Sequence, residues 1–193
     1  MEEDKIDISP SLIVIGGSAG SLQPIFSILD ALKPGFRTPI LLVLHRVTTT
    51  ESTLRDLLSV KTRMKVNEIE EKEAIRKGHL YICPADYHVL VEPDHSFSLD
   101  ASEKINYSRP SIDVVFKSAA EIYRQQLTAV LLSGANADGV EGLHFAKQLG
   151  GTTIVQDPED AVVAYMPNQA LKYFTPDLVL DARGIAQALN KLA

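Results

Sequence analysis

Three side chains of the types used in nucleophilic catalysis each follow an apolar run of the sequence. Ser18 lies in a glycine-rich turn after the first run, His45 closes the second, and Asp138 lies in a glycine-bounded loop after a third. Serine needs a base within about 3 Å to take its proton, and the imidazole of that base needs a carboxylate to hold its tautomer. These residues therefore predict acyl-transfer chemistry, with Ser18 as nucleophile, His45 as general base and Asp138 as the group that orients His45.

The spacing of Ser18 and His45 along the chain supports their pairing. The runs before them, 12–15 and 39–44, have the character of consecutive strands in one strand–helix–strand unit. Consecutive strands joined in this way are often neighbours, about 4.8 Å apart, and both residues would then emerge at the same edge of the sheet. That placement is the one a serine–histidine pair needs.

The turn at Ser18 has a second interpretation, which is a cradle for a nucleotide phosphate. A dinucleotide fingerprint needs Gly-x-Gly-x-x-Gly and then an acidic residue at the end of the second strand. Here Ile15 stands in place of the first glycine, His45 stands where the acid is needed, and a Walker-type lysine is missing. These departures count against the phosphate interpretation.

Each of the three side chains also has a structural interpretation. His45 could be a hydrogen-bonded core histidine, and Asp138 could be the N-cap of the helix that follows its loop. Asp157 and Asp160 follow another predicted strand and are rival carboxylates for the same edge. The residue pattern alone leaves these alternatives open.

Strand-like and helix-like segments alternate along most of the chain, which predicts an α/β fold. The expected architecture is a doubly wound, mostly parallel sheet with helices on both faces and a small antiparallel hairpin insertion. Expected strands lie at 12–15, 39–44, 64–69, 127–132, 152–155 and 178–180, and short extended segments of the insertion at 80–83, 89–92 and 96–99. Expected helices include one opening at 111–113, one at 168–173 and one at 184–192. The length predicts one domain, with residues 1–10 as a flexible leader and 11–193 as the catalytic domain.

The composition argues against several classes of function. Twenty-five acidic and 19 basic residues give a net charge of −6, which argues against a nucleic-acid partner. The single cysteine, Cys83, excludes an internal disulfide and a cysteine-based metal cluster. No run approaches the roughly 18 apolar residues needed to span a bilayer, and the acidic N-terminus is unlike a secretory signal. We expect a cytoplasmic protein without direct membrane insertion.

The remaining polar candidates have weaker patterns. His79, His88, His95 and His144 lack metal-ligand spacing, and structural or solvated roles are expected for them, with His88 the most open to another role. Arg109 precedes a predicted helix and could meet an anionic substrate, although an ordinary loop arginine is the more frequent case.

The order Ser18, His45, Asp138 resembles the catalytic domain of the CheB family, the chemotaxis protein-glutamate methylesterases. The resemblance runs from about residue 12 to residue 180 and rests on six pieces that occur in the same order along the chain. They are Ile15-Gly16-Gly17-Ser18-Ala19-Gly20, His45 closing the second strand, Gly78-His79-Leu80-Tyr81-Ile82-Cys83-Pro84 with His88, Arg109-Pro110-Ser111-Ile112-Asp113-Val114-Val115-Phe116, Ser133-Gly134-Ala135-Asn136-Ala137-Asp138-Gly139-Val140-Glu141-Gly142, and Gln156-Asp157-Pro158 with Tyr165-Met166-Pro167.

The resemblance implies hydrolysis of γ-glutamyl methyl esters on chemoreceptors, with release of methanol, and deamidation of receptor glutamine in some members. It implies the same roles for the three residues, with backbone N–H groups stabilising the oxyanion and no metal or organic cofactor. The oxyanion and substrate candidates are Gly17, Ala19, Ala135 and Asn136. The implied partner is a methylated chemoreceptor cytoplasmic domain or a related signalling protein.

Four departures from the family pattern leave the substrate open. Ala19 replaces a usual threonine after the nucleophile, Ser21 replaces a glycine, and Ala135 replaces a methionine. Arg46-Val47 follows His45 where a proline-containing turn is frequent. Ten leader residues cannot supply the receiver domain of typical members, so a separate regulatory partner is expected if activity is controlled. The alternatives are an esterase or amidase for another substrate, or a non-catalytic chemosensory signalling module that retains the fold.

Overall fold

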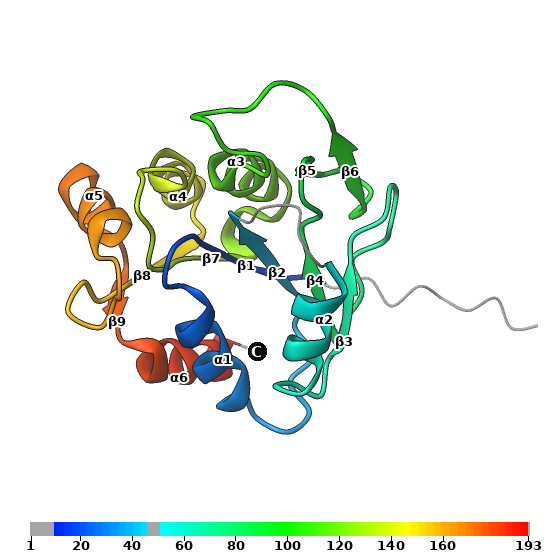
Figure 1. Cartoon of the computed structure of the whole chain (residues 1–193), viewed down its shortest axis with the longest axis horizontal. Coiled ribbons are helices and arrows are strands. Elements are labelled where there is room, and N and C mark those ends of the chain that lie inside the picture. The colour runs from blue at the N-terminus through cyan, green and yellow to red at the C-terminus, as the bar shows by residue number, and fades with distance from the viewer. Residues whose placement is uncertain (1–9, 46–50, 193) are drawn as a thin grey trace, which may run out of the picture.

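The computed structural model describes residues 10–45 and 51–192, which form helices on both faces of a parallel sheet (Figure 1). The strands are β1 (Leu12–Gly17), β2 (Ile40–Leu44), β3 (Lys65–Glu68), β4 (His79–Ile82), β5 (His88–Val91), β6 (Phe97–Asp100), β7 (Leu127–Leu131), β8 (Thr152–Gln156) and β9 (Leu178–Leu180). The helices are α1 (Leu22–Asp30), α2 (Glu51–Ser59), α3 (Ile112–Tyr123), α4 (Val140–Gln148), α5 (Tyr165–Tyr173) and α6 (Ala182–Leu192), with a 3₁₀ turn, η1 (Arg124–Gln126).

The main sheet has seven strands in the described residues, in the order β3-β4-β2-β1-β7-β8-β9, and every neighbouring pair is parallel. β1 lies between β2 and β7, with Gly17 opposite Leu44 and Gly16 opposite Leu131. The carboxyl ends of these three strands are therefore level with one another. The predicted fold class and the predicted pairing of the first two strands are confirmed.

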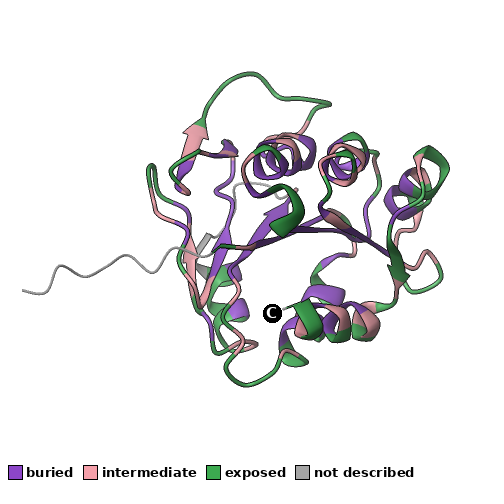
Figure 2. Cartoon of the chain, turned by 180° about the vertical axis from the view of Figure 1, so that it is seen from behind, coloured by how far each residue is buried: buried purple, intermediate pink, exposed green. Residues whose placement is uncertain are grey.

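Two helical layers bury the two faces of the sheet. Along β1, Val14 packs with residues of α3, α4 and α5, whereas Ile13 and Ile15 pack with residues of α1, α2 and α6. Because strand side chains alternate between faces, an uninterrupted apolar run is the pattern that such a doubly covered strand requires. Figure 2 shows the central strands buried between these layers, with the outer turns of the helices exposed.

The expectation for segment 80–83 was wrong. It forms most of β4, which lies in the main sheet between β2 and β3 and is not part of the insertion. Leu80 and Ile82 face one helical layer, while Tyr81 and Cys83 face the other, so the segment is buried on both sides. Its short length and the following Pro84 resemble a hairpin strand, and only the two-sided burial distinguishes it. Segments 89–92 and 96–99 do form the antiparallel pair β5–β6.

Several boundaries differ from the expected ones by a few residues. α5 begins at Tyr165 and α6 at Ala182, earlier than expected, whereas α3 opens where its capping serine predicts. Of the expected leader, residues 1–9 lie outside the described residues. The division into a leader and one catalytic domain over 11–193 stays a prediction.

Close packing of α3 against β1 positions the start of that helix. A Cβ atom on Gly16 would overlap the side chain of Ile112, so only glycine allows this approach. The amino end of α3 is thereby held above the carboxyl end of β1, where the loop after β7 also arrives.

Candidate active site

The three predicted catalytic residues lie at the carboxyl ends of three neighbouring strands. Ser18 follows β1, His45 follows β2, and Asp138 lies in the loop after β7. Backbone hydrogen bonds extend the sheet past the last strand residues, because Ser18 N donates to Ser133 O (2.9 Å) and His45 N donates to Gly17 O (3.3 Å). Ser18 and His45 are therefore adjacent across two strands, as their spacing predicts.

The structure brings His45 and Asp138 into direct contact. Nε2 of His45 lies 2.7 Å from Oδ2 of Asp138, with the carboxylate buried and the imidazole only slightly exposed. A short contact of this kind between a buried carboxylate and a ring nitrogen fixes the orientation of the imidazole. His45 is thus held by a specific partner at the sheet edge and is not an isolated core histidine.

Asn136 determines which nitrogen of His45 carries the proton. Its Oδ1 accepts a hydrogen bond from Asp138 N (3.0 Å), so its Nδ2 faces the ring and lies 3.3 Å from Nδ1 of His45. An amide N–H at Nδ1 makes that nitrogen an acceptor, which leaves Nε2–H to donate to Asp138. In neutral His45, Nδ1 is therefore the basic nitrogen.

Asp138 lies at the amino end of α3 and does not cap the helix that follows it. Its carboxylate accepts hydrogen bonds from Ile112 N (2.7 Å), Asp113 N (3.0 Å) and Ser111 Oγ (3.0 Å), while the cap position of α4 is Gly139. Burial acts to raise the pKa of Asp138, but the hydrogen bonds from His45 and the α3 backbone outweigh it and lower the pKa below the ordinary value. The site thus holds this carboxylate in its charged form.

Asp113 makes the complementary contact to the neighbouring helix. Its Oδ1 accepts from Gly142 N (2.6 Å) in the first turn of α4. Asp138, just before α4, therefore binds the amino end of α3, and Asp113 of α3 binds the amino end of α4. Burial and the nearby charge of Asp138 raise the pKa of Asp113 to about 6, against the opposing hydrogen bond from Gly142.

We expect Asp113→Asn to change how stability depends on pH. A carboxyl with a folded pKa near 6 binds more protons than the unfolded chain between about pH 4 and 6, so its contribution to stability falls as the pH rises through that window. Asparagine keeps the acceptor for Gly142 N and does not titrate. Between pH 4 and pH 7, the free energy of unfolding of the variant should rise relative to that of the wild type by up to about 3 kcal/mol. Urea unfolding at both pH values measures this, and an unchanged difference between the two proteins would refute it.

Ser18 is half-buried in a turn whose backbone is well held. Its carbonyl accepts from Ser21 N (3.1 Å) and Ser21 Oγ (2.7 Å). Gly20 has φ +77°, and a Cβ there would lie 2.8 Å from Ser133 Oγ, so the turn needs glycine at this position. Within the described residues, Ser18 Oγ forms no hydrogen bond, either to His45 or to another group. The structure thus places Ser18 and His45 at adjacent strand ends, with no direct hydrogen bond between their side chains.

The four oxyanion candidates lie around the same edge. Gly17 ends β1, and Ala19 and Ala135 are exposed on the turns after β1 and β7. The N–H groups of Ala19 and Ala135 donate to no acceptor in the described part of the chain. Asn136 was expected to contact substrate. In the structure its side-chain amide contacts Nδ1 of His45. The roles of all four stay predictions.

The remaining sequence candidates have other contacts. His88 is buried, with Nδ1 accepting from Ser111 N (3.1 Å) and Nε2 3.0 Å from Glu103 O. Arg109 donates to Ala101 O and Ser102 O. The other histidine rings contact aromatic side chains: His79 with Tyr81, His95 with Tyr123, and His144 with Tyr173 and Phe174.

The rival carboxylates have local partners. Asp157 accepts from Glu159 N, and Asp160 accepts from Gln156 Nε2 and Ala182 N. Over residues 10–45 and 51–192, no group of three or more His, Cys, Asp or Glu side chains is arranged to hold a metal ion. In the same ranges, no helix is both long enough and apolar enough to cross a bilayer.

Ser111 is the site residue that the sequence reasoning did not single out. It was recognised only as the start of a helix, yet its hydroxyl donates to Asp138 while its backbone N–H donates to His88. The pattern Ser111-Ile112-Asp113 predicts that Ser111 caps a helix. It does not predict that the Ser111 hydroxyl binds Asp138, which is distant in the sequence.

Comparison with known proteins agrees with this geometry. Residues 13–189 match the family model described as CheB methylesterase. The chain belongs to the CheB methylesterase family. The predicted enzyme class, a carboxylic-ester hydrolase, is confirmed by this membership.

Similar proteins include a Leptospira interrogans protein named as a candidate protein-glutamate methylesterase/protein-glutamine glutaminase. It is 41% identical over 180 residues, which is 93% of each chain. The Thermotoga maritima protein-glutamate methylesterase/protein-glutamine glutaminase is 35% identical over 96% of this chain, which spans 55% of that relative. The crystal structure of the T. maritima CheB methylesterase catalytic domain superposes with a TM-score of 0.91, covering 96% of this chain and all of that one, at 34% identity. The CheB fold is therefore shared over nearly the whole chain.

Proposed function

We propose that this protein hydrolyses γ-glutamyl methyl esters on the cytoplasmic domain of a chemoreceptor, with Ser18, His45 and Asp138 as its catalytic residues. The observation that carries the proposal is the 2.7 Å contact between His45 and Asp138, on the strand end next to Ser18, in a member of the CheB methylesterase family. We also propose deamidation of glutamine as a related activity, because relatives carry both names. A cytoplasmic location follows from the proposed substrate.

In the proposed reaction, Ser18 Oγ attacks the ester carbonyl while Nδ1 of His45 takes its proton. Asp138 keeps the proton of Nε2 in place and stabilises the imidazolium that forms. The same nitrogen then protonates the departing methoxide, which leaves as methanol. Water, activated by His45, attacks the acyl-enzyme and releases the glutamate carboxylate.

The contact between Asn136 and His45 must open before this proton transfer. Nδ1 has one lone pair, which Asn136 Nδ2 occupies in this structure, so Ser18 and Asn136 compete for it. When substrate moves Ser18 onto Nδ1, the released amide of Asn136 joins the N–H groups of Ala19 and Ala135 as a donor for the oxyanion. The tetrahedral intermediate is then bound at the turns where the chain differs from the usual family pattern.

Methanol release from receptor-containing membranes with methylated glutamates tests this function. We expect the wild-type protein to release methanol and to leave the corresponding carboxylates on the receptor. If no methanol is released but an organophosphonate labels Ser18, the protein is a serine hydrolase for another substrate. If neither occurs, the non-catalytic signalling role replaces the proposal.

Ser111→Ala should lower methanol release more than it lowers stability. The change removes the hydrogen bond from Oγ to Asp138 and the side-chain cap of Val114 N, which lies 3.4 Å from Oγ. We expect a loss of about 1 kcal/mol of stability and a roughly tenfold loss in kcat. The control is Ser118→Ala in the same helix, whose hydroxyl binds Val91 N and Val115 O and lies outside the Asp138 contacts. Equal kcat losses in the two variants would assign Ser111 a structural role only.

A further inference from the structure

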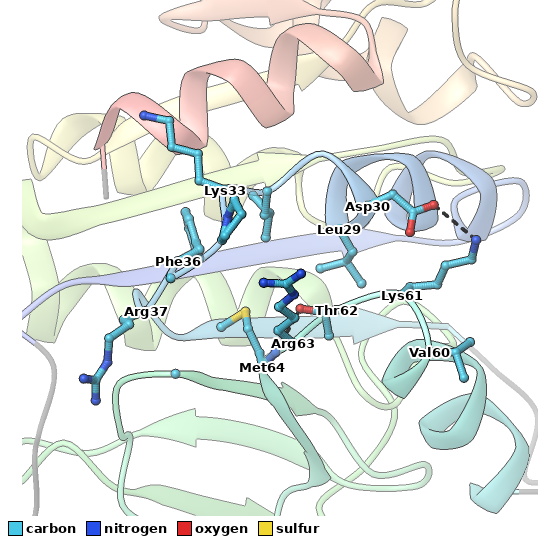
Figure 3. Close-up of a pocket in the computed structure, with 14 residues that line it drawn as sticks. Leu29, Asp30, Lys33, Phe36, Arg37, Val60, Lys61, Thr62, Arg63 and Met64 are labelled. Carbon is cyan, nitrogen blue, oxygen red and sulfur yellow. Dashed lines mark hydrogen bonds and ion pairs between the residues drawn. The ribbon is translucent and has the colours of Figure 1, made fainter.

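A cavity of about 580 Å³ lies at the opposite edge of the sheet from Ser18. Its walls come from the segment between α1 and β2, the segment between α2 and β3, and Gly78 just before β4. Because β2, β3 and β4 all begin there, the cavity belongs to the amino edge of the sheet, whereas the proposed catalytic residues lie at the carboxyl edge. Figure 3 shows the lining side chains, from Phe36 and Arg37 on one side to Val60 and Lys61 on the other.

Positive charge gathers around this cavity in a chain that is acidic overall. Lys33, Arg37, Lys61 and Arg63 line it, and Asp30 is the single acidic residue among its lining residues. Lys61 Nζ is paired with Asp30 Oδ2 at 3.1 Å, so the one lining carboxylate is already bound to one of the lining cations. Like charges at one concave site repel one another, and an anion in the cavity relieves that repulsion.

Arg63 is the cation best placed to meet a ligand. Figure 3 shows its side chain reaching into the middle of the ring of lining residues, whereas Lys61 points aside to Asp30. Lys33 Nζ donates to Asn190 O of α6 (3.3 Å). In the part of the chain that the structure describes, the guanidinium of Arg63 forms no hydrogen bond or ion pair. A guanidinium offers two parallel N–H groups, which match two oxygens of a phosphate or carboxylate.

The floor of the cavity is apolar, and its walls are joined to one another. Leu29 and Met64 are buried and Phe36 is half-buried, so a ligand would find hydrocarbon surface beside the guanidinium. Gly78 N donates to Arg37 O (2.6 Å) and Lys65 N donates to Gly78 O (2.9 Å), which links the three segments. A concave site of this size that combines apolar surface with charged side chains can hold a small molecule that has both an organic body and negative charge.

We propose that this cavity binds a small organic anion with two or more negative charges, with Arg63 as the central contact and the lysines at the rim. The volume favours a small molecule over a flat protein surface, and the apolar floor favours an organic body over a bare ion. Phosphate and carboxylate groups share the chemistry that Arg63 recognises. The site is separate from Ser18 and does not depend on the proposed esterase activity.

Isothermal titration of the full chain at low salt tests the site with three probes. AMP supplies a phosphate on a planar body, pyrophosphate supplies charge without a body, and citrate supplies carboxylates. We expect AMP to bind most tightly, and its affinity to fall as salt is added, since exposed charge interactions are screened. If citrate binds more tightly than AMP, the anion is a carboxylate; if pyrophosphate binds as tightly as AMP, the apolar floor plays no part.

Arg63→Gln provides the decisive comparison. Loss of the charged hydrogen bonds should weaken probe binding roughly tenfold to hundredfold, and Arg63→Lys should lose less because it keeps the charge. The matched control is Arg55→Gln on α2, whose exposed side chain pairs only distantly with Asp56 and lies outside the cavity lining. The proposal is overturned if no probe binds the wild type at millimolar concentration, or if Arg63→Gln and Arg55→Gln bind the probes equally well. Either result leaves methanol release at Ser18 unaffected, so the two proposals fail separately.

Discussion

Ser18→Ala is expected to reduce methanol release by roughly 10⁴-fold or more while leaving the fold intact. The hydroxyl is the only group proposed to bond covalently to the ester carbonyl, so its loss removes the acyl-enzyme route. What remains is substrate binding and the oxyanion donors, which act on attack by water alone. Because Ser18 Oγ has no hydrogen-bond partner among the described residues, the alanine variant loses no such bond in the folded state.

The control for this variant is Ser27→Ala on the exposed side of α1. Its hydroxyl donates to Gln23 O within the helix, so the change has the same chemistry away from the sheet edge. Wild type, Ser18→Ala and Ser27→Ala should unfold at similar urea concentrations, and only Ser18→Ala should lose methanol release. A folded Ser18→Ala protein that releases methanol at the wild-type rate would rule out Ser18 as the nucleophile.

The parts of this site that depend on neighbouring strands were predictable from the sequence. Continuous apolar runs predicted buried parallel strands, and the rule that consecutive strands are often adjacent placed His45 beside Ser18. The same reasoning failed for β4, because the position of a short strand in the sheet depends on which helices cover it. Local apolar pattern carries no information on that.

The sequence predicted the contact of Asp138 with His45, but it did not predict the contacts of Asp138 with the start of α3. Its hydrogen bonds to Ile112 N and Asp113 N join two helix starts that lie more than 20 residues apart along the chain. The local rule for an aspartate before a helix left a cap on α4 open as an alternative, whereas in the structure the cap position is Gly139 and the carboxylate binds the start of α3. Similarly, Asn136 was predicted to contact the oxyanion or the substrate, whereas its contact with the Nδ1 atom of His45 depends on the folded loop.

Asp138→Asn should reduce both activity and stability, because four donors converge on this carboxylate. They are His45 Nε2, Ile112 N, Asp113 N and Ser111 Oγ. Asparagine has one acceptor oxygen where aspartate has two, so its NH₂ group must face some of these donors. Buried donors left without acceptors should cost about 2–4 kcal/mol in the free energy of unfolding.

The loss of activity in Asp138→Asn has a separate cause. An NH₂ group opposite Nε2 favours the tautomer in which Nε2 is the acceptor and Nδ1 carries the proton. Nδ1 can then no longer take the proton of Ser18, so kcat should fall by roughly 10⁴-fold, as expected for a misplaced tautomer. Urea unfolding and methanol release, measured on the same preparation, separate the two effects.

Asp157→Asn is the matched control, since Asp157 follows β8 at the same edge and was the rival carboxylate. It accepts a hydrogen bond from Glu159 N on Oδ1, which asparagine can also accept. The variant should keep wild-type activity and stability. If Asp157→Asn lost methanol release while folded Asp138→Asn kept it, the carboxylate that orients His45 in the working enzyme would be Asp157, and the 2.7 Å contact between His45 and Asp138 would be structural.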